Sequence, residues 1–426
     1  MPRIASHIRV TVPVACALIT AMAGCGDLLE VSDPSRFVDE DLDNPQAFDA
    51  LANGPEGRLQ QMYSLHVIHT GLLGDELFST GTWGQYRTIA NGSFEPGGEA
   101  SQAETLMTIR TEAREARERF ARVLGDDAAT SEFTGRVLAV EGWTNLLLGT
   151  LSCETVLEPF GPAVSDMEAY AAAIPTLTEA MTVLQAADEP DYHDFALAGR
   201  ARAHLMIGNL DEALADARAV PDGFVYEAIF TEQGAANSVV TLITFTENKA
   251  AGIREMWWPQ VDTTGAEDVF LDAYTGEVDP RVEIVHRHTN RLGVDGFSKH
   301  YSQFKYQARS DNIAMASKDE MRLIEAEVLM RQGDLPGAMA ILNDLRAKAG
   351  LSALPNPGTE EGVRDVLLNE RFAELFMEGH RANDLYRFDL ISERLGPDRA
   401  MKFALPDDEA ILNPNVSEPR SCPERS

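Results

Sequence analysis

The sequence is poor in basic residues, in cysteine and in aromatic side chains, and each shortage excludes a class of protein. It has 36 Lys and Arg against 68 Asp and Glu, which gives a formal net charge of −32 at pH 7. Because nucleic-acid binding depends on basic side chains that neutralise phosphates, nucleic acid is not expected as a partner. The four cysteines form neither CxxC nor CxxCH, so a zinc ribbon, a thioredoxin-type site and c-type haem attachment have no support. Aromatic residues make up only 7% of the chain, which argues against a large stacking platform for long polymers.

The chain also lacks an apolar run of the roughly 20 residues that a membrane-spanning helix needs. Residues 1–24 hold two arginines, no acidic residue, and a shorter apolar run that ends in small residues, which is the order of a secretory signal peptide. Met22-Ala23-Gly24-Cys25 resembles a bacterial lipobox, with Met22 where leucine is usual. That resemblance implies that Cys25 is acylated and anchors the protein to a membrane that it does not span. The alternative is a plain secreted signal followed by a chance cysteine.

Two cysteines remain for the folded part of the chain once Cys16 leaves with the signal peptide and Cys25 carries lipid. Disulfides persist in the oxidising compartment that a secretory signal implies. Cys153 and Cys422 can therefore form a bridge or stay as two buried thiols, and the sequence alone does not decide between them.

A helical-repeat pattern appears twice in the chain. Around Gly208 and around Gly333, one alanine stands seven residues before the glycine and another stands five after it: Ala201 and Ala213 in the first copy, Ala326 and Ala338 in the second. Small residues let two antiparallel helices approach closely, and glycine favours the left-handed turn between them. Asn209 and Asp334 are the expected caps of the second helices. The pattern is that of a tetratricopeptide-like unit, with a fainter copy at residues 142–149.

Other helices are expected from local signals. Asn44 and Pro45 open a helix over 44–64, and helical spacing of apolar residues predicts another over 99–124. Ser165 and Glu168 form a capping box that begins a helix at about 166–187.

The two clear repeats are too far apart to be neighbours, so the array is interrupted. The interruption is an irregular segment, residues 222–310, with a β-like run at 239–245 and many aromatic residues. We therefore expect a mainly α fold of tetratricopeptide-like helical pairs with an irregular, partly β ligand-binding subregion. The expected parts are 1–24 (signal peptide), 25–221 (N-terminal helices), 222–310 (candidate ligand-binding subregion) and 311–426 (C-terminal helices).

The C-terminal part carries the most specific motifs. They are Leu323-Ile324-Glu325-Ala326-Glu327, Ala349-Gly350-Leu351, Glu370-Arg371, Glu378-Gly379-His380-Arg381, Asp384-Leu385 and Asn413-Pro414-Asn415. With these residues the sequence resembles the SusD/RagB family of outer-membrane lipoproteins. The resemblance covers nearly the whole mature chain and is strongest from 320 to 415.

The resemblance implies a lipid-anchored protein of the outer membrane, exposed at the cell surface, that needs no cofactor and performs no chemistry. It implies an oligosaccharide or peptide ligand, which the protein delivers to a SusC-like TonB-dependent transporter. The alternative from another class is a tetratricopeptide-type envelope scaffold lipoprotein with protein partners and no small ligand.

Aromatic residues beside polar ones are the candidate ligand contacts, because a sugar ring offers an apolar face for stacking and hydroxyls for hydrogen bonds. The segment 75–87 has that mixture, and in the family a loop of this region lines the binding surface. The candidate contacts are Trp83, Tyr86, Arg87, Trp257 and Trp258. The competing interpretation is that the adjacent tryptophans fill the core or contact the transporter.

Glu370, Glu374 and Glu378 have the i, i+4, i+8 spacing of one helical face, with His380 beyond, and paired carboxylates can hydrolyse glycosides. Because Arg371, Arg381 and Arg387 are close in sequence, we interpret the carboxylates as a structural ion-pair network and predict no enzyme. The pairs His66/His69 and His286/His288 lack a third ligand, so no metal site is predicted either.

Overall fold

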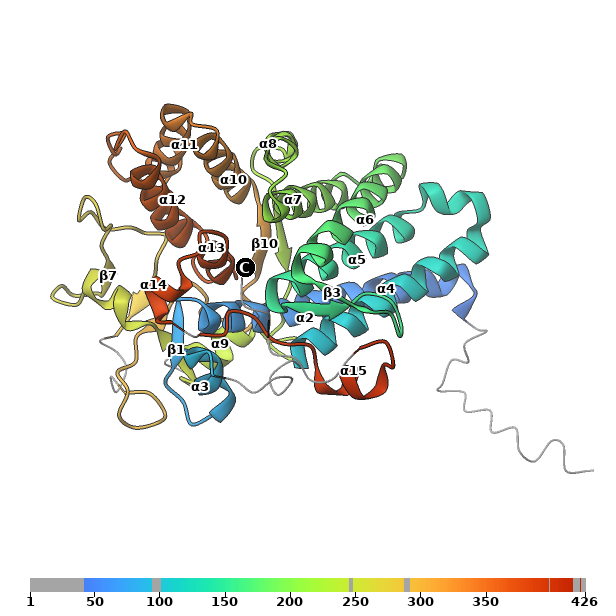
Figure 1. The fold of residues 1–426 in the computed structure, drawn as a ribbon, viewed down its shortest axis with the longest axis horizontal. Coiled ribbons are helices and arrows are strands. Elements are labelled where there is room, and N and C mark those ends of the chain that lie inside the picture. Colours follow the sequence, from blue (N-terminus) through green and yellow to red (C-terminus); the bar gives the residue numbers. More distant parts are fainter. Residues whose placement is uncertain are drawn as a thin grey trace, which may run out of the picture. The chain divides into compact units, whose positions relative to one another are not determined.

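The computed structural model describes residues 42–93, 101–244, 248–286, 292–397, 399–416 and 422. The predicted signal peptide and the predicted acylation site at Cys25 lie outside these residues. The chain divides into two units, Met1–Pro45 and Gln46–Ser426. The second unit holds the helices α2–α15 and all the strands described below (Figure 1).

The second unit is mainly helical, as the sequence predicts. Its helices are α2 (Phe48–Leu73), α3 (Gly84–Asn91), α4 (Ser101–Leu124), α5 (Glu132–Leu151), α6 (Asp166–Ala186), α7 (Pro190–Ile207), α8 (Leu210–Ala219), α9 (Ser238–Ile243), α10 (Lys318–Arg331), α11 (Leu335–Lys348), α12 (Glu360–Glu374), α13 (Arg381–Arg387), α14 (Ile391–Leu395) and α15 (Asp407–Leu412). Short 3-10 turns are η2 (Pro45–Ala47), η3 (Gly125–Thr130) and η4 (Glu255–Gln260).

The strands are short and join only in antiparallel pairs within the described residues. The pairs are β1 (Leu77–Ser79) with β5 (Ala251–Ile253), β2 (Glu154–Val156) with β3 (Ala163–Ser165), β4 (Val225–Ala228) with β10 (Ile313–Ser317), β6 (Val261–Asp262) with β7 (Val269–Phe270), and β8 (Ile284–Val285) with β9 (Ser302–Gln303). Six of these ten strands, β4 to β9, lie in the irregular subregion that was expected between the helical parts. The boundaries of that subregion stay a prediction, and the β4–β10 pair connects residues on both sides of position 310.

The α5–α6 pair shows how closely the helices pack. Three glycines of α5 are spaced by seven residues and face three large side chains of α6 that have the same spacing in the opposite direction: Gly135, Gly142 and Gly149 face Leu184, Leu177 and Tyr170. A Cβ at these glycines would lie 2.5, 2.5 and 2.9 Å from the facing side chain. A larger residue at these positions would force the facing side chain to shift, so glycine favours this close antiparallel contact.

The two clear repeats are the helix pairs α7–α8 and α10–α11. Gly208 (φ +81°) and Gly333 (φ +84°) make the left-handed turns between the helices, as predicted. Asp334 caps α11 by accepting a hydrogen bond from the Gly337 N–H at 2.9 Å. The capping prediction is wrong for Asn209, whose side-chain amide lies instead 3.3 Å from His204 Nδ1.

The remaining helix predictions are confirmed with shifted ends. The capping box at Ser165 and Glu168 is present and begins α6. The first helix starts at Phe48, after η2, and continues beyond the expected end to Leu73. Residue 99, the expected start of the next helix, lies outside the described residues, and α4 ends at Leu124 as expected.

The expected β-like run at 239–245 is wrong, because Ser238–Ile243 forms the helix α9. Asn237 caps this helix by accepting a hydrogen bond from the Val239 N–H at 2.9 Å. Val239, Val240 and Ile243 are buried at helical spacing, so one apolar face packs inward. Burial of this face outweighs the preference of β-branched residues for strands.

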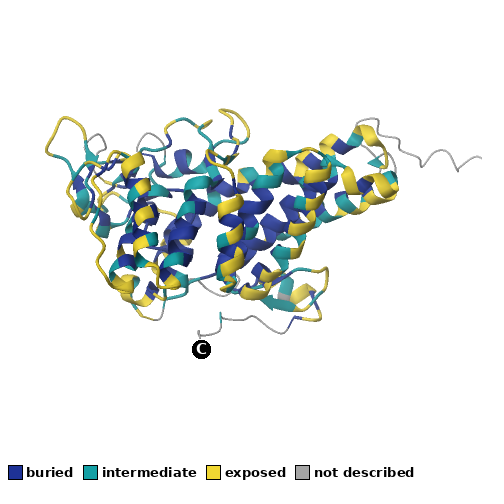
Figure 2. Ribbon diagram, turned by 90° about the horizontal axis from the view of Figure 1, so that it is seen from above, coloured by how far each residue is buried: buried dark blue, intermediate teal, exposed yellow. Residues whose placement is uncertain are grey.

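The core lies where the helices meet, as Figure 2 shows by the buried residues on facing sides of the helices. Within the part of the chain that the structure describes, no helix is both long and apolar enough to cross a membrane.

Candidate functional site

Three segments far apart in sequence converge on Thr80, which is fully buried. β1 brings residues 77–80 alongside β5, and Thr80 Oγ1 donates a hydrogen bond to the Lys249 carbonyl oxygen at 2.8 Å. The same hydroxyl lies 3.0 Å from Nδ1 of His300, whose pKa burial lowers to about 4. A Cβ on Gly293 would lie 2.2 Å from the Thr80 carbonyl oxygen, so this close approach requires glycine. The predicted segment 75–87 is thereby fixed to two parts of the irregular subregion.

The hairpin at 292–301 interacts with two of the predicted ligand contacts, Arg87 from the segment 75–87 and Trp258 from the irregular subregion. Burial acts to raise the pKa of its Asp295, but hydrogen bonds from Ser298 and Phe297 N–H groups and the charge of Arg87 lower it. The Nζ atom of Lys299 lies 5.9 Å from the centre of the Trp258 ring. The hairpin therefore carries Lys299, which lies near the Trp258 ring, and Asp295, whose charge interacts with that of Arg87.

Trp258 belongs to a row of stacked, half-buried rings. Its ring lies 4.6 Å from that of Tyr301, with an angle of 16° between the planes. Tyr301 in turn stacks on His286 at 4.0 Å and 4°. Phe78 of β1 meets the edge of Trp258 at 5.9 Å. The indole N–H of Trp258 donates to the Ile253 carbonyl oxygen at 2.8 Å, which fixes the ring in place.

Trp83 of the segment 75–87 and Phe297 of the hairpin are exposed aromatic side chains. Trp83 is 40% exposed and packs edge-on against Tyr86 at 5.4 Å, while Phe297 at the hairpin tip is 76% exposed. Tyr86 is buried, and burial raises its pKa to about 12. Tyr86 is therefore a core residue against which Trp83 packs. Arg87 is exposed.

The adjacent tryptophans have different environments. Trp257 is only 5% exposed and stacks on Phe372 of α12 at 3.6 Å. Its indole N–H donates to the Asp75 carbonyl oxygen at 2.7 Å, and the Arg381 guanidinium lies 5.3 Å from its ring. Trp257 is therefore a core residue, whereas Trp258 is half-buried at the surface.

Sequence reasoning did not select Tyr301, His286 or Phe78 as candidates. Tyr301 belongs to the aromatic residues of the irregular segment, and Phe78 lies inside the segment 75–87, so composition marks their neighbourhood. Only the β1–β5 pairing and the hairpin bring them to Trp258.

The motif Glu378-Gly379-His380-Arg381 holds the start of the segment 75–87 in place. Arg381 forms an ion pair with Asp75 at 2.5 Å, and both side chains are buried. Glu76 accepts a hydrogen bond from the Met377 N–H at 2.8 Å. Burial raises the pKa of Glu76 to about 7, against the lowering effect of that hydrogen bond. The motif therefore positions the site and does not line it.

The carboxylates at 370, 374 and 378 form the structural ion-pair network that was predicted, but with other partners. Glu370 pairs with Arg346 at 2.5 Å and with Arg281 at 2.9 Å. Glu374 pairs with Arg281 at 3.1 Å, and Glu378 with Lys305 at 2.7 Å.

The partners expected from sequence proximity bind other carboxylates. Arg371 pairs with Asp384 at 2.9 Å, Arg387 with Glu327 at 2.6 Å, and Arg381 with Asp75. The expected single helical face is also wrong, because α12 ends at Glu374. Met377 and Gly379 have positive φ angles of 57° and 86°, so Glu378 lies in a turn.

No group of three or more His, Cys, Asp or Glu side chains that could hold a metal occurs among the described residues. Burial lowers the pKa values of His66 and His69 to about 3, which makes both neutral core histidines. His286 is part of the ring stack, and His288 lies outside the described residues.

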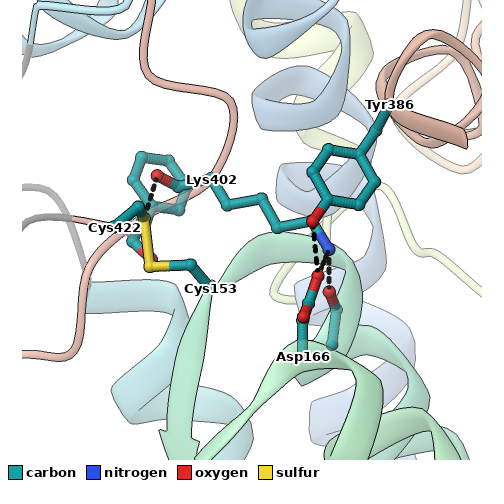
Figure 3. The surroundings of a disulfide bond; sticks show 7 residues. Cys153, Asp166, Tyr386, Lys402 and Cys422 are labelled. Carbon is teal, nitrogen blue, oxygen red and sulfur yellow. Dashed lines mark hydrogen bonds and ion pairs between the residues drawn. A yellow bond between two sulfur atoms is a disulfide. The ribbon is translucent and has the colours of Figure 1, made fainter. Parts of the chain in front are cut away.

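Cys153 and Cys422, whose state the sequence leaves open, are joined in a disulfide (Figure 3). The Cys153 N–H donates to the Phe403 carbonyl oxygen at 3.0 Å. Beside the disulfide, buried Lys402 donates to Asp166 at 2.6 Å, and the Tyr386 hydroxyl donates to the same carboxylate at 2.9 Å. The disulfide joins Cys422 to the residue before β2, and the ion pair joins Lys402 to the start of α6.

A hollow of about 580 Å³ lies between α8, α10 and α11. The described residues that line it include no aromatic side chain, and its charges pair with one another, for example Arg218 with Glu325 at 2.8 Å and Arg322 with Asp344 at 3.1 Å. This groove offers no surface for stacking.

Comparison with known proteins identifies the fold. A SusD superfamily protein from Bacteroides vulgatus ATCC 8482 matches with a TM-score of 0.70 at 16% identity, over 88% of this chain and 98% of that chain. A laminarin-binding SusD-like protein matches with a TM-score of 0.70 at 14% identity, over 89% and 99%. A SusD superfamily protein from Bacteroides thetaiotaomicron VPI-5482 matches with a TM-score of 0.67 at 14% identity, over 88% and 99%. The protein therefore has the SusD-like fold.

The sequence gives a second, independent match. Residues 319–409 match the model of the SusD family, whereas no curated protein sequence matches the chain. Together with the fold, this match confirms the resemblance to the SusD/RagB family.

Proposed function

We propose that the protein is a lipid-anchored, non-enzymatic nutrient-binding protein of the outer-membrane surface that captures an oligosaccharide and delivers it to a SusC-like TonB-dependent transporter. The observation that carries the binding role is the row of half-buried rings Trp258, Tyr301 and His286, near which Lys299 lies. The lipid anchor rests on the sequence around Cys25.

The chemistry of this surface suits a sugar. Because Tyr301 lies between Trp258 and His286, the C–H face of a pyranose can stack only on the outer rings of the row. Lys299, whose Nζ atom lies 5.9 Å from the centre of the Trp258 ring, supplies a hydrogen-bond donor for a hydroxyl group beside that ring. Similar proteins support the same ligand class, because one is described as laminarin-binding and another, from Bacteroides vulgatus, as a SusD-like carbohydrate binding protein.

The carboxylates weighed as a catalytic pair have cationic partners. The carboxylates that could have formed a hydrolytic pair, Glu370 and Glu374, are held by Arg346 and Arg281. Arg346 and Arg281 hold these carboxylates in fixed ion pairs, although burial raises the pKa of Glu374. The ion pairs support binding without chemistry.

The experiment is a titration of the soluble protein, without residues 1–25, against a panel of neutral hexasaccharides and short peptides. We expect saturable binding of at least one glycan, weakened at least about 10-fold by Trp258→Ala, the scale for loss of a central aromatic contact. Phe160→Ala is the matched control, because Phe160 is an exposed ring on the β2–β3 hairpin outside the site. Equal affinities of the Trp258 variant and the wild type would refute the site.

Two outcomes would favour other functions. Saturable binding of peptides alone would replace the sugar as ligand. Absence of any saturable ligand, together with stable capture of envelope proteins, would favour the scaffold alternative. The transporter partner is tested separately, by purifying the acylated full-length protein from membranes. Recovery of a large β-barrel protein with it is expected, and recovery of an untethered protein from the periplasm would contradict the anchor.

A further inference from the structure

A second hollow is lined in part by Trp257 and Gln260 of η4, the 3-10 turn that also carries Trp258. It has a volume of about 420 Å³ and is bounded by the segment after β7 and by α12, α13 and α14, which Figure 1 shows at the same end of the unit. Pockets for small ligands start at about 300 Å³. The buried ring of Trp257 forms part of its wall, whereas Trp258 turns away to stack on Tyr301.

The three arginines that line this cavity already lie near carboxylates. Arg364 pairs with Asp365 at 3.0 Å, and Arg381 pairs with Asp75 at 2.5 Å. Arg394 lies 3.9 Å from the same Asp75 carboxylate. The cavity therefore offers no unpaired arginine to an anionic ligand.

Two neutral side chains of the cavity have polar groups without a partner among the described residues. The Gln260 Oε1 atom is buried and has no hydrogen-bond partner within the described part of the chain. The Asn369 side chain, which also lines the cavity, makes no hydrogen bond to any described residue. Each amide can both donate and accept, as a sugar hydroxyl can. A ligand rich in hydroxyl groups would satisfy them.

Tyr274 brings a partly exposed aromatic ring to the lining of the cavity. Tyr274 is 46% exposed, and its backbone N–H donates to Asp272 Oδ1 at 3.2 Å. Asp272 is itself fixed, because it accepts hydrogen bonds from Thr275 and pairs with the fully buried Arg346 at 3.0 Å. The backbone that carries Tyr274 is therefore fixed, which lowers the entropy lost there when a ligand binds.

We propose that this cavity is a second saccharide site, which takes one or two neutral, hydroxyl-rich sugar rings. The Tyr274 ring packs against the apolar face of the sugar, and the amides of Gln260 and Asn369 bond to its hydroxyls. This inference rests on the proposed function for the class of ligand, but its residues are separate from the Trp258 stack.

The test is a calorimetric titration with laminarihexaose and maltohexaose as neutral probes and trigalacturonate as the charged probe, using the wild type and Tyr274→Ala, Asn369→Ala and Trp258→Ala. We expect two sites in the wild type for at least one neutral probe. Tyr274→Ala and Asn369→Ala each weaken one site at least 10-fold and leave the other unchanged. Phe160→Ala is the exposed-ring control and should retain both sites.

The variants separate the two sites. A single site that is lost in Trp258→Ala and unchanged in Tyr274→Ala and Asn369→Ala would overturn the second site and leave the proposed function standing. Binding that is lost in Tyr274→Ala and unchanged in Trp258→Ala would support the cavity and contradict the Trp258 surface. Tighter binding of trigalacturonate at the Tyr274 site would overturn the neutral ligand class. Failure of both neutral probes to bind the wild type would contradict both proposals.

Discussion

Arg346 is the side chain whose removal should most clearly expose the structural role of the acidic cluster. Its side chain is fully buried on α11 and contacts Asp272 at 3.0 Å and Glu370 at 2.5 Å. Its Nε also donates to the Ser352 carbonyl oxygen at 2.8 Å. Arg346→Met keeps much of the side-chain volume and removes the charge and all these bonds.

The expected loss follows from which carboxylate is left without a cation. Glu370 keeps Arg281 at 2.9 Å. Asp272 is also fully buried and keeps only the hydrogen bonds from its own turn, such as that from the Thr275 N–H at 2.8 Å. Breaking a buried pair by removing one partner costs about 3–5 kcal/mol. Because one of the two carboxylates stays paired, we expect a loss near the lower end, about 3 kcal/mol of unfolding free energy.

The stability lost in Arg346→Met should depend on pH in a direction that follows from the pKa of Asp272. Burial acts to raise the pKa of Asp272, but hydrogen bonds from Arg346 and Thr275 outweigh it and lower the pKa. A carboxyl with a lowered pKa in the folded protein contributes stability above the pKa of the unfolded chain, about 3.9, and loses it as the pH falls. The difference between wild type and variant should therefore be largest at neutral pH and shrink below about pH 4.

The assay is urea unfolding followed by circular dichroism at pH 7 and at pH 3.5. Lys348→Met on the same helix is the matched control. Its ion pair with Asp319 is exposed, so the loss should be only about 0–1 kcal/mol. Equal losses for Arg346→Met and Lys348→Met at pH 7 would refute the reasoning. So would measurable glycoside hydrolysis by the wild type that Glu370→Gln abolishes.

Two further predictions concern the disulfide and a buried histidine. Cys422→Ser should lower the unfolding free energy by about 2–5 kcal/mol, since the bridge closes a loop of 269 residues; reduced wild type should match the variant in urea unfolding, and an unchanged midpoint would contradict this. Burial lowers the pKa of His69 to about 3, so the unfolded chain binds a proton below about pH 6.5 that the folded protein does not. Relative to His69→Phe, the wild type should therefore lose about 1.4 kcal/mol of stability per pH unit from pH 6 to 4, and parallel pH profiles of the two proteins would disprove a buried neutral imidazole.

The predictable features are those that neighbouring residues encode. The capping box at Ser165 and Glu168, and the turn glycines Gly208 and Gly333, depend on contacts within a few residues, and all of them are present. Asn209 shows the limit even here, because a histidine five residues away takes its amide.

Long-range partners could not be inferred in this way. Sequence proximity suggests Arg371 as a partner for Glu370, but the actual partners, Arg281 and Arg346, come from other elements. The adjacent Trp257 and Trp258 are equivalent in the sequence, yet η4 directs one to Phe372 and the other to Tyr301. Apolar composition at 239–245 was compatible with a strand or a helix, and burial of one face decided for the helix α9.

The crystal structure of the protein with the neutral hexasaccharide that binds most tightly tests the central claim most directly. We predict a sugar ring stacked on Trp258 or Trp83, with Lys299 or Arg87 at its hydroxyl groups. A hexasaccharide in the groove between α8, α10 and α11, with none on the Trp258 surface, would contradict the account.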